Sequence, residues 1–433
     1  RRQRQMCIRD SSGSVSATSH YEDIVSIGNN SAGLLVQTIG GGGGYTGISS
    51  GQQLALGGNL SAGSNSSAGD VNLNTSSRIT TSGDNSAALI VQSIAGGGGA
   101  SAKNSGESVR LGAIAAGNSG ETRAISGNVS VANEANLLTT GTGSAALIAQ
   151  SIGGGGGYIA QTDSLASYSI YVGAIGDVVA DSGNVTLTNT AERLETQGNY
   201  APVLTVQSIG GGGGYALLDA ITGSVTQLGA STRFKSTETT SNAGAVTVTN
   251  NADVLSTGVS STAFTIQSIG GGGGVINSAG GPLRLGSSRV EGSQSAGDVN
   301  LTNTGSIQTS GYTSGGLLVQ TIGGGGGIVG GSSHGETQLG AEASTSHNSV
   351  ASGNVSVTSN GATITTEGAG ANGLMVQTIG GGGGFLGKAE SGIRLGGVGI
   401  TDVQAGGVTV SNRSVITTSG NASSALVVQS IGG

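Results

Sequence analysis

The feature that most constrains this chain is a short block of glutamine and glycine that recurs eight times. Each copy is a Gln followed by Ser or Thr, then Ile, then glycines, with one copy carrying Ala95 in front of its glycines. The glutamines are Gln37, Gln92, Gln150, Gln207, Gln267, Gln320, Gln377 and Gln429. Their spacings are 55, 58, 57, 60, 53, 57 and 52 residues. Self-similarity of this kind predicts a repeat architecture in which neighbouring copies stack and share one core.

Other positions are constant when counted back from each glutamine. Ser or Thr stands eleven residues before it, and Ile, Leu or Val stands thirteen residues before it, as at Ile79 and Leu194. Further upstream lies the pattern Ala/Ser-Gly-x-Val-x-Val/Leu, as at residues 68–73. A glycine stands nine residues before every glutamine: Gly28, Gly83, Gly141, Gly198, Gly258, Gly311, Gly368 and Gly420.

The apolar residues of these patterns alternate with a period of two in short runs bounded by Gly, Asn, Asp and Ser. That alternation indicates β-strands, and no helical stripe persists along the chain. Three strands fit into about 24 residues, which suits one three-sided solenoid rung. The rest of each repeat varies but usually holds a fourth strand that ends in Leu-Gly, as at Leu111 and Leu339. We therefore expect an all-β fold, a right-handed parallel β-helix with about two rungs per 52–60 residue repeat and a rod of roughly 70 Å.

The two ends differ from the repeats. Residues 1–11 are basic and contain Cys7, the only cysteine, and we interpret them as a sequencing-adapter scar that is not native. Residues 12–433 are then expected to form a single solenoid of seven full repeats with partial ends, cut from a longer parent.

Charge and composition exclude some classes of function. The formal net charge is −7, and it becomes −10 without residues 1–11, so the chain is not expected to bind nucleic acid. No run of about 18 apolar residues is present, so we expect no membrane insertion by a helix.

The glycine runs admit three interpretations. The first is structural: the backbone turns through positive φ values or packs where no Cβ fits. A phosphate cradle is disfavoured because neither a following helix nor a Gly-Lys-Ser/Thr motif is present. The third interpretation is a strip without side chains, against which a glycan or a second chain could lie.

The strand that carries the glutamine is apolar on both faces, so both faces should be covered. We expect the variable part of the same molecule to cover the second face, with a neighbouring molecule as the alternative. Two rungs per repeat would separate successive glutamines by about twice the strand spacing. Each glutamine amide is therefore expected to bond the backbone of its own glycine run.

A search for catalytic or metal-binding chemistry finds no candidate. His20, His334 and His347 lie in variable segments and are expected to be solvated, with no cluster at metal-ligand spacing. The acidic residues do not recur as a pair at one repeat position. Glycan cleavage needs such a pair at one site only, so a single pair brought together by folding stays open as an alternative. We expect no enzyme activity, no cofactor and no metal.

A Ser or Thr stands eleven residues before each glutamine, two residues after the core Ile, Leu or Val. In a strand this places its side chain on the same face as the core, so we expect it to be buried and to bond the backbone. The column on the opposite face is irregular, which disfavours ice binding.

The block Ser144–Gly157 resembles glycine-rich passenger regions of large autotransporter (type V secretion) outer-membrane proteins of Gram-negative bacteria, and the likeness recurs over about residues 21–433. The resemblance implies an extracellular rod at the bacterial cell surface, anchored through a C-terminal barrel outside this sequence. It implies a structural or adhesive role, with contacts to a surface, glycan or host ligand through the variable rungs and possible self-association. A glycan-processing enzyme on a β-helix and an ice-binding solenoid are the alternatives.

Overall fold

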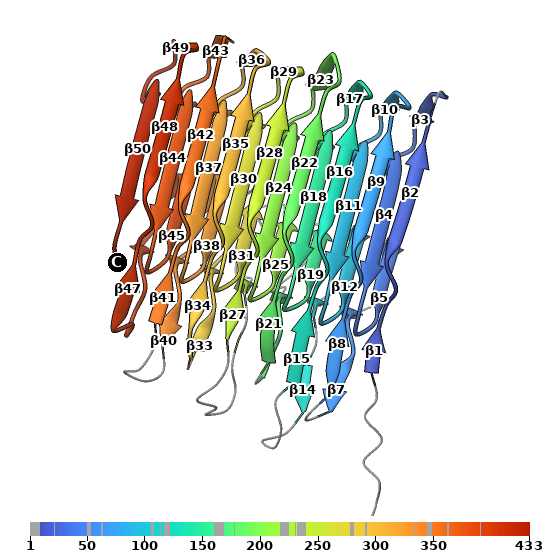
Figure 1. Cartoon of the computed structure of the whole chain (residues 1–433), viewed down its shortest axis with the longest axis vertical. Helices are drawn as coiled ribbons and strands as arrows, with labels where there is room; N and C mark the ends of the chain where they lie inside the picture. Colours follow the sequence, from blue (N-terminus) through green and yellow to red (C-terminus); the bar gives the residue numbers. More distant parts are fainter. Residues whose placement is uncertain are drawn as a thin grey trace, which may run out of the picture.

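The alternating Val, Ile, Leu and Thr residues form short strands, and in the computed structural model every described strand pair is parallel (Figure 1). The chain is thus an all-β parallel solenoid, as predicted. The structure describes residues 9–433 apart from 21, 50–52, 62–63, 105–107, 113, 117–121, 160–168, 177, 217–224, 230, 232–239, 278–280, 291, 334, 344–348, 362 and 390. His334, His347 and most of the proposed adapter scar lie outside the described residues.

Each repeat forms one rung, so the prediction of two rungs per repeat is wrong. Val71 pairs with Val129, Leu89 with Leu147, and Gly98 with Gly156, each one repeat further along. The strands of the variable part pair with their own counterparts in the next repeat, and none stacks on the regular part of its own repeat. Seven steps of about 4.8 Å give a stack of roughly 34 Å, half the predicted length.

Three sheets of eight strands come from the constant part of the repeat. The front sheet comprises β2 (Val15–Ser19), β9 (Val71–Thr75), β16 (Val129–Asn133), β22 (Val185–Asn189), β28 (Val246–Asn250), β35 (Val299–Asn303), β42 (Val355–Ser359) and β48 (Val408–Asn412). The corner sheet comprises β3 (Ile24–Ser26), β10 (Ile79–Thr81), β17 (Leu137–Thr139), β23 (Arg193–Thr196), β29 (Asp253–Ser256), β36 (Ile307–Thr309), β43 (Thr363–Thr366) and β49 (Val415–Thr418). The glutamine sheet comprises β4 (Leu34–Ile39), β11 (Leu89–Ile94), β18 (Leu147–Ile152), β24 (Leu204–Ile209), β30 (Phe264–Ile269), β37 (Leu317–Ile322), β44 (Leu374–Ile379) and β50 (Leu426–Ile431).

The rest of each repeat supplies three further sheets and two short pairs. The glycine sheet comprises β5 (Gly43–Ser49), β12 (Gly98–Asn104), β19 (Gly156–Ile159), β25 (Gly213–Ala216), β31 (Gly273–Ile276), β38 (Gly326–Ser333) and β45 (Gly383–Ala389). The leucine sheet, which contains the predicted fourth strand, comprises β6 (Gln53–Leu56), β13 (Ser108–Leu111), β20 (Ser169–Val172), β26 (Val225–Leu228), β32 (Leu283–Leu285), β39 (Thr337–Leu339) and β46 (Ile393–Leu395). The closing sheet comprises β1 (Arg9–Ser11), β8 (Asn65–Ser67), β15 (Thr122–Ile125), β21 (Val178–Asp181), β27 (Ser241–Asn242), β34 (Gln294–Ser295), β41 (Ser349–Ala351) and β47 (Asp402–Gln404). The short pairs are β7 (Asn59–Ser61) with β14 (Ile114–Ala116) and β33 (Ser288–Val290) with β40 (Glu342–Ala343).

These sheets form layers with separate cores between them. Val and Leu side chains of the front and corner sheets pack against one face of the glutamine sheet. The other face of the glutamine sheet, with Ile90 and Ile148, packs against Tyr158 and Tyr215 of the glycine sheet. The glycine and leucine sheets enclose a further core that includes Ile159 and Leu111. The variable part of each repeat therefore covers the second apolar face from within the molecule, as expected.

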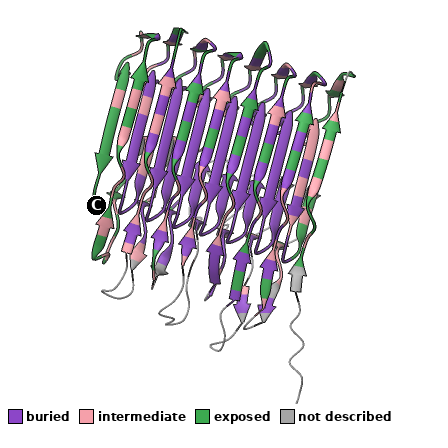
Figure 2. Ribbon diagram, in the orientation of Figure 1, coloured by how far each residue is buried: buried purple, intermediate pink, exposed green. Residues whose placement is uncertain are grey.

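Burial follows the stacking direction. Strands of the inner rungs are buried along the glutamine sheet, whereas the first and last rungs are largely exposed or half-buried (Figure 2). The described part of the chain contains no helix that could cross a membrane.

Candidate functional site

The eight repeat glutamines form one continuous ladder of side-chain hydrogen bonds. Each amide Nε2 donates to the Oε1 of the glutamine one rung further along, over 2.5–2.8 Å, from Gln37 through to Gln429. Gln92, Gln150, Gln207, Gln267 and Gln320 are fully buried. The prediction that each glutamine bonds its own glycine run is therefore wrong. It failed because one rung per repeat places neighbouring amides at the strand spacing, where they bond directly.

The glycine nine residues before each glutamine is required by close stacking. A Cβ on Gly83, Gly141, Gly198, Gly258, Gly311, Gly368 or Gly420 would lie 1.8–2.1 Å from the carbonyl oxygen of its counterpart one rung away. Gly28, in the first rung, would meet only the Ser31 side chain, at 3.1 Å. These glycines are structural positions and present no functional group.

The glycine runs also have a structural role. The last two glycines of each run pair in register with their counterparts in the glycine sheet and adopt φ values between +132° and +148°. A Cβ on Gly213 would lie 1.8 Å from the carbonyl oxygen of Gly273. Both parts of the structural interpretation, positive φ and absence of room, are confirmed. The exposed-strip interpretation is wrong for the inner rungs, where the runs are buried.

A second ladder escaped the sequence reasoning. At the end of the front-sheet strands, Asn133, Asn189, Asn250 and Asn303 are fully buried. Each of the first three donates from Nδ2 to the Oδ1 of the next asparagine over 2.6–2.8 Å, and Asn303 donates to the carbonyl oxygen of Gly305 at 2.8 Å. Asn133 also donates to the carbonyl oxygen of Ala135 at 2.9 Å. The sequence does contain a signal for this ladder, because the asparagine of Val-x-Val-x-Asn occupies an inward-facing position of the alternating strand.

The Ser/Thr column of the corner sheet is buried and bonds backbone, as predicted. Thr139 and Thr309 donate to the carbonyl oxygens five residues further on, Ser144 and Ser314, over 2.5 Å. Thr196 differs, because its hydroxyl donates to Ser256 Oγ at 3.3 Å.

The outer face of the front sheet is a regular, uncharged polar surface. Two columns of outward side chains run along it, one row per rung, and Ala132 is the single member without a hydroxyl or amide. One column is Ser16, Asn72, Ser130, Thr186, Thr247, Asn300, Ser356 and Thr409; the other is Thr18, Asn74, Ala132, Thr188, Thr249, Thr302, Thr358 and Ser411. Sequence reasoning from the irregular corner-sheet column missed this array.

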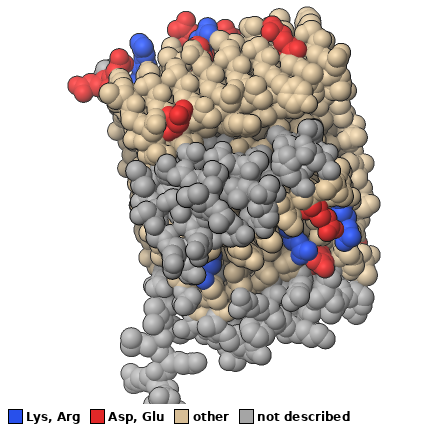
Figure 3. All heavy atoms as spheres, turned by 180° about the vertical axis from the view of Figure 1, so that it is seen from behind, with Lys and Arg blue, Asp and Glu red and all other residues tan. Residues whose placement is uncertain are grey.

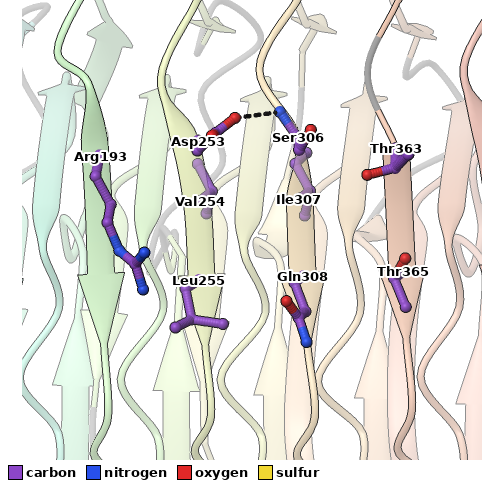
Figure 4. A pocket seen from close by; sticks show the side chains of 9 residues that line it. All are labelled: Arg193, Asp253, Val254, Leu255, Ser306, Ile307, Gln308, Thr363 and Thr365. Atoms are coloured by element: carbon purple, nitrogen blue, oxygen red, sulfur yellow. Dashed lines mark hydrogen bonds between the residues drawn. The ribbon is translucent and has the colours of Figure 1, made fainter.

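A shallow hollow of about 180 Å³ lies over the outer face of the corner sheet (Figure 4). Its one carboxylate, Asp253, accepts a hydrogen bond from the Ser306 amide at 2.9 Å. Arg193 lines it and pairs with Glu195 at 2.9 Å, and Glu195 also accepts from Gln197. Glycoside hydrolysis uses two carboxyl groups facing one bond. The hollow offers one, and that one already bonds the next rung.

Titratable groups elsewhere are sparse. His20 is exposed and its Nδ1 lies 2.9 Å from Ser76 Oγ, in agreement with a solvated position. No group of three or more His, Cys, Asp or Glu that could hold a metal ion occurs among the described residues. On the rear face, charged side chains are few and scattered over the part that the structure describes (Figure 3).

Burial shifts the ionisation of two tyrosines. Tyr158 and Tyr215 stack with ring centroids 5.6 Å apart and an interplanar angle of 17°. Desolvation by burial, together with a coulombic contribution from a neighbouring tyrosine, raises the pKa of both phenols well above the usual value of 10.0. Their hydroxyls donate to the carbonyl oxygens of Gly143 and Tyr200, each at 3.1 Å. These tyrosines have a structural role, because each phenol is neutral and its hydroxyl is hydrogen-bonded to a backbone carbonyl.

The recurring polar residues thus build the scaffold, and the part of the chain that the structure describes offers the front-sheet array and the corner-sheet hollow as surfaces for contact. Comparisons with family models, with curated proteins and with solved structures find no match for this chain.

Proposed function

We propose that this chain is a non-catalytic passenger rod of a bacterial cell-surface autotransporter, which makes adhesive contacts with a surface or a glycan. The observation that carries the proposal is where the repeated polar side chains lie and what they bond. The glutamine and asparagine ladders and the Ser/Thr column are buried and bonded within the stack. The glutamine and the Ser/Thr residue recur eight times and serve the stack in the rungs that the structure describes, which supports a role as a rod.

The resemblance of residues 144–157 to autotransporter passengers supports the cell-surface location and the anchor outside this sequence. A β-solenoid gives a passenger two useful properties. It stacks rung by rung through nearest-neighbour contacts, and it presents long parallel faces to a partner. Variable segments, which differ between repeats, are where we place specific recognition.

The test is binding to immobilised glycans and to host or abiotic surfaces, with reducing-sugar release measured in the same wells. Binding without sugar release is expected. Sugar turnover would favour the glycan-processing alternative, and absence of binding to every surface tested would contradict the adhesive role.

A linker exchange locates the contact. Residues 217–224 connect β25 with β26, and residues 277–282 make the same connection one rung later, between Ile276 and Leu283. The exchanged segment, 217–225, also includes the first residue of β26, because Ala216 pairs with Ile276 and Thr226 pairs with Leu283. Replacing the first linker by the second should reduce glycan binding and leave the thermal midpoint unchanged. The same replacement at residues 160–169, one rung earlier, is the matched control for position.

Ice binding remains a second candidate, and the front-sheet array is the observation that favours it. Its rows repeat at about 4.8 Å between rungs and about 6.7 Å along each strand. Thermal hysteresis of the purified chain tests it: Thr186→Lys and Thr247→Lys should abolish the effect, whereas Gln308→Lys on the corner sheet should not. An unmodified chain without hysteresis excludes this candidate.

A further inference from the structure

We propose that the outer face of the leucine sheet binds an acidic glycan. In this site the guanidinium of Arg110 pairs with a carboxylate of the glycan, and the ring of Tyr171 lies against a sugar ring. The inference rests on the adhesive role proposed above, and it gives that role a site and a class of ligand.

One column of side chains in the leucine sheet carries the inference. Val109 and Leu111 face the core between the glycine and leucine sheets, so Arg110 between them faces outwards, and it is half-buried. Its counterparts pair in register from rung to rung, and the column consists of Ala55, Arg110, Tyr171, Gln227, Arg284, Gln338 and Arg394. Every member after Ala55 is a hydrogen-bond donor through a guanidinium, an amide or a phenol, and none is a carboxylate.

This column differs from the rest of the surface. The chain of 433 residues holds 16 Lys and Arg and 8 Tyr, and the outward columns of the front sheet consist almost wholly of Ser, Thr and Asn. Large planar donors are therefore concentrated in a single column, in rows about 4.8 Å apart. Such a column matches a ligand that presents acceptor oxygens at regular intervals along its length.

Two members of the column bond the same position of the following rung. Gln227 Nε2 donates to Ser288 Oγ at 3.2 Å, and Arg284 Nη1 pairs with Glu342 Oε2 at 2.7 Å. Ser288 and Glu342 are paired counterparts in neighbouring rungs. The protein itself thus supplies an acceptor to each of these two donors.

Arg110 has no such acceptor. The residue that corresponds to Glu342 in the rung after Arg110 is Ile175, because the two positions lie in one column. The fold therefore places an aliphatic side chain where Arg284 meets a carboxylate. The Nε of Arg110 is buried, and within the described part of the chain it has no hydrogen-bond partner. A carboxylate of a ligand would supply the group that this guanidinium lacks.

The neighbours of Arg110 favour a glycan over an acidic peptide. Tyr171 is the counterpart of Arg110 one row along, and it is half-buried. Its ring can lie against the C–H face of a sugar while its hydroxyl faces water. Gln227 follows in the next row, and its amide keeps a second hydrogen for a sugar hydroxyl. A linear glycan that contains uronic acids meets all three groups at once.

Binding of the purified chain to immobilised polygalacturonate tests the proposal, with its methyl ester as the uncharged ligand. We expect the acid form to bind more tightly than the ester. Arg110→Gln should weaken binding of the acid form by at least about tenfold, because a charge-assisted pair is lost. Ile175→Glu should weaken it comparably, because it supplies a carboxylate to Arg110 from within the molecule. Arg193→Gln makes the same change on the corner sheet and should leave binding unchanged.

Soluble polyglutamate separates a glycan from an acidic peptide. Tyr171→Leu should weaken binding of polygalacturonate, and polyglutamate should compete poorly with it. Circular dichroism of every variant confirms that it folds.

Three results overturn the inference and leave the adhesive role in place. The first is binding of polygalacturonate that Arg110→Gln does not change. The second is binding to other glycans or surfaces without any preference for the acid form over the ester. The third is equal competition by polyglutamate, which would identify an acidic peptide as the ligand. Absence of binding to every surface tested would contradict the adhesive role and this inference together.

Discussion

At the scale of the residue, the glutamine ladder predicts that loss of a glutamine side chain destabilises the protein more in an inner rung than in the last rung. Gln207→Ala removes the acceptor for Gln150 Nε2 and the donor for Gln267 Oε1, both fully buried. Unsatisfied buried amide groups cost about 1–3 kcal/mol each, so we expect the free energy of unfolding measured in urea to fall by about 2–6 kcal/mol. Gln429→Ala is the matched control, because it affects only Gln377 at a half-open end. Equal losses for the two variants would contradict the ladder.

Tyr158 and Tyr215 make a prediction about alkaline pH. Desolvation by burial raises the pKa of both phenols above the value near 10 expected in the unfolded chain. Their contribution to stability is therefore complete below pH 10 and is lost as the pH rises through the folded pKa. We expect the unfolding midpoint in urea to fall above pH 10, and to fall less in Tyr158→Phe/Tyr215→Phe. An identical pH dependence in the double variant would exclude these tyrosines as the cause.

At the scale of the element, the tight corner between rungs explains the column of single glycines. A Cβ on Gly258 would lie 1.8 Å from the Gly198 carbonyl oxygen, and rung-to-rung pairing on both sides prevents the backbone from moving away. Overpacking of this kind costs about 1–3 kcal/mol or more, so Gly258→Ala should lower the thermal midpoint clearly. Gly28→Ala makes the same change in the first rung, where only the Ser31 side chain is near, and should change the midpoint little. Differential scanning calorimetry of both variants checks the difference.

Elements also mark the limit of what could be predicted from the sequence. Strands, their parallel stacking and the buried Ser/Thr column follow from alternation and from the constant spacing to each glutamine. The number of rungs per repeat did not follow, because the leucine-sheet and closing-sheet strands have few fixed residues beyond Leu-Gly. From its sequence, a strand such as Val225–Leu228 can stack on the regular part of its own repeat or on Leu283–Leu285 of the next repeat. The strand pairing in the structure shows that it stacks on the next repeat. The error over the glutamines came from this choice, since it doubled their assumed separation.

At the scale of the whole molecule, the stack behaves as a one-dimensional array, since each rung contacts only the rungs beside it. Opening of a terminal rung breaks one interface, whereas opening of a central rung breaks two and leaves buried ladders unpaired. We therefore expect amide hydrogen exchange to be slowest in β24 and β30 and to quicken towards β4 and β50. A matched pair of substitutions tests the same gradient in side-chain energetics. Val206 is fully buried and Val428 is 46% exposed in the same column. Val206→Ala should cost about 1–3 kcal/mol and Val428→Ala less than half of that, because the terminal side chain is already partly hydrated. Uniform exchange from end to end would mean that the rungs open together, and the array description would then be wrong.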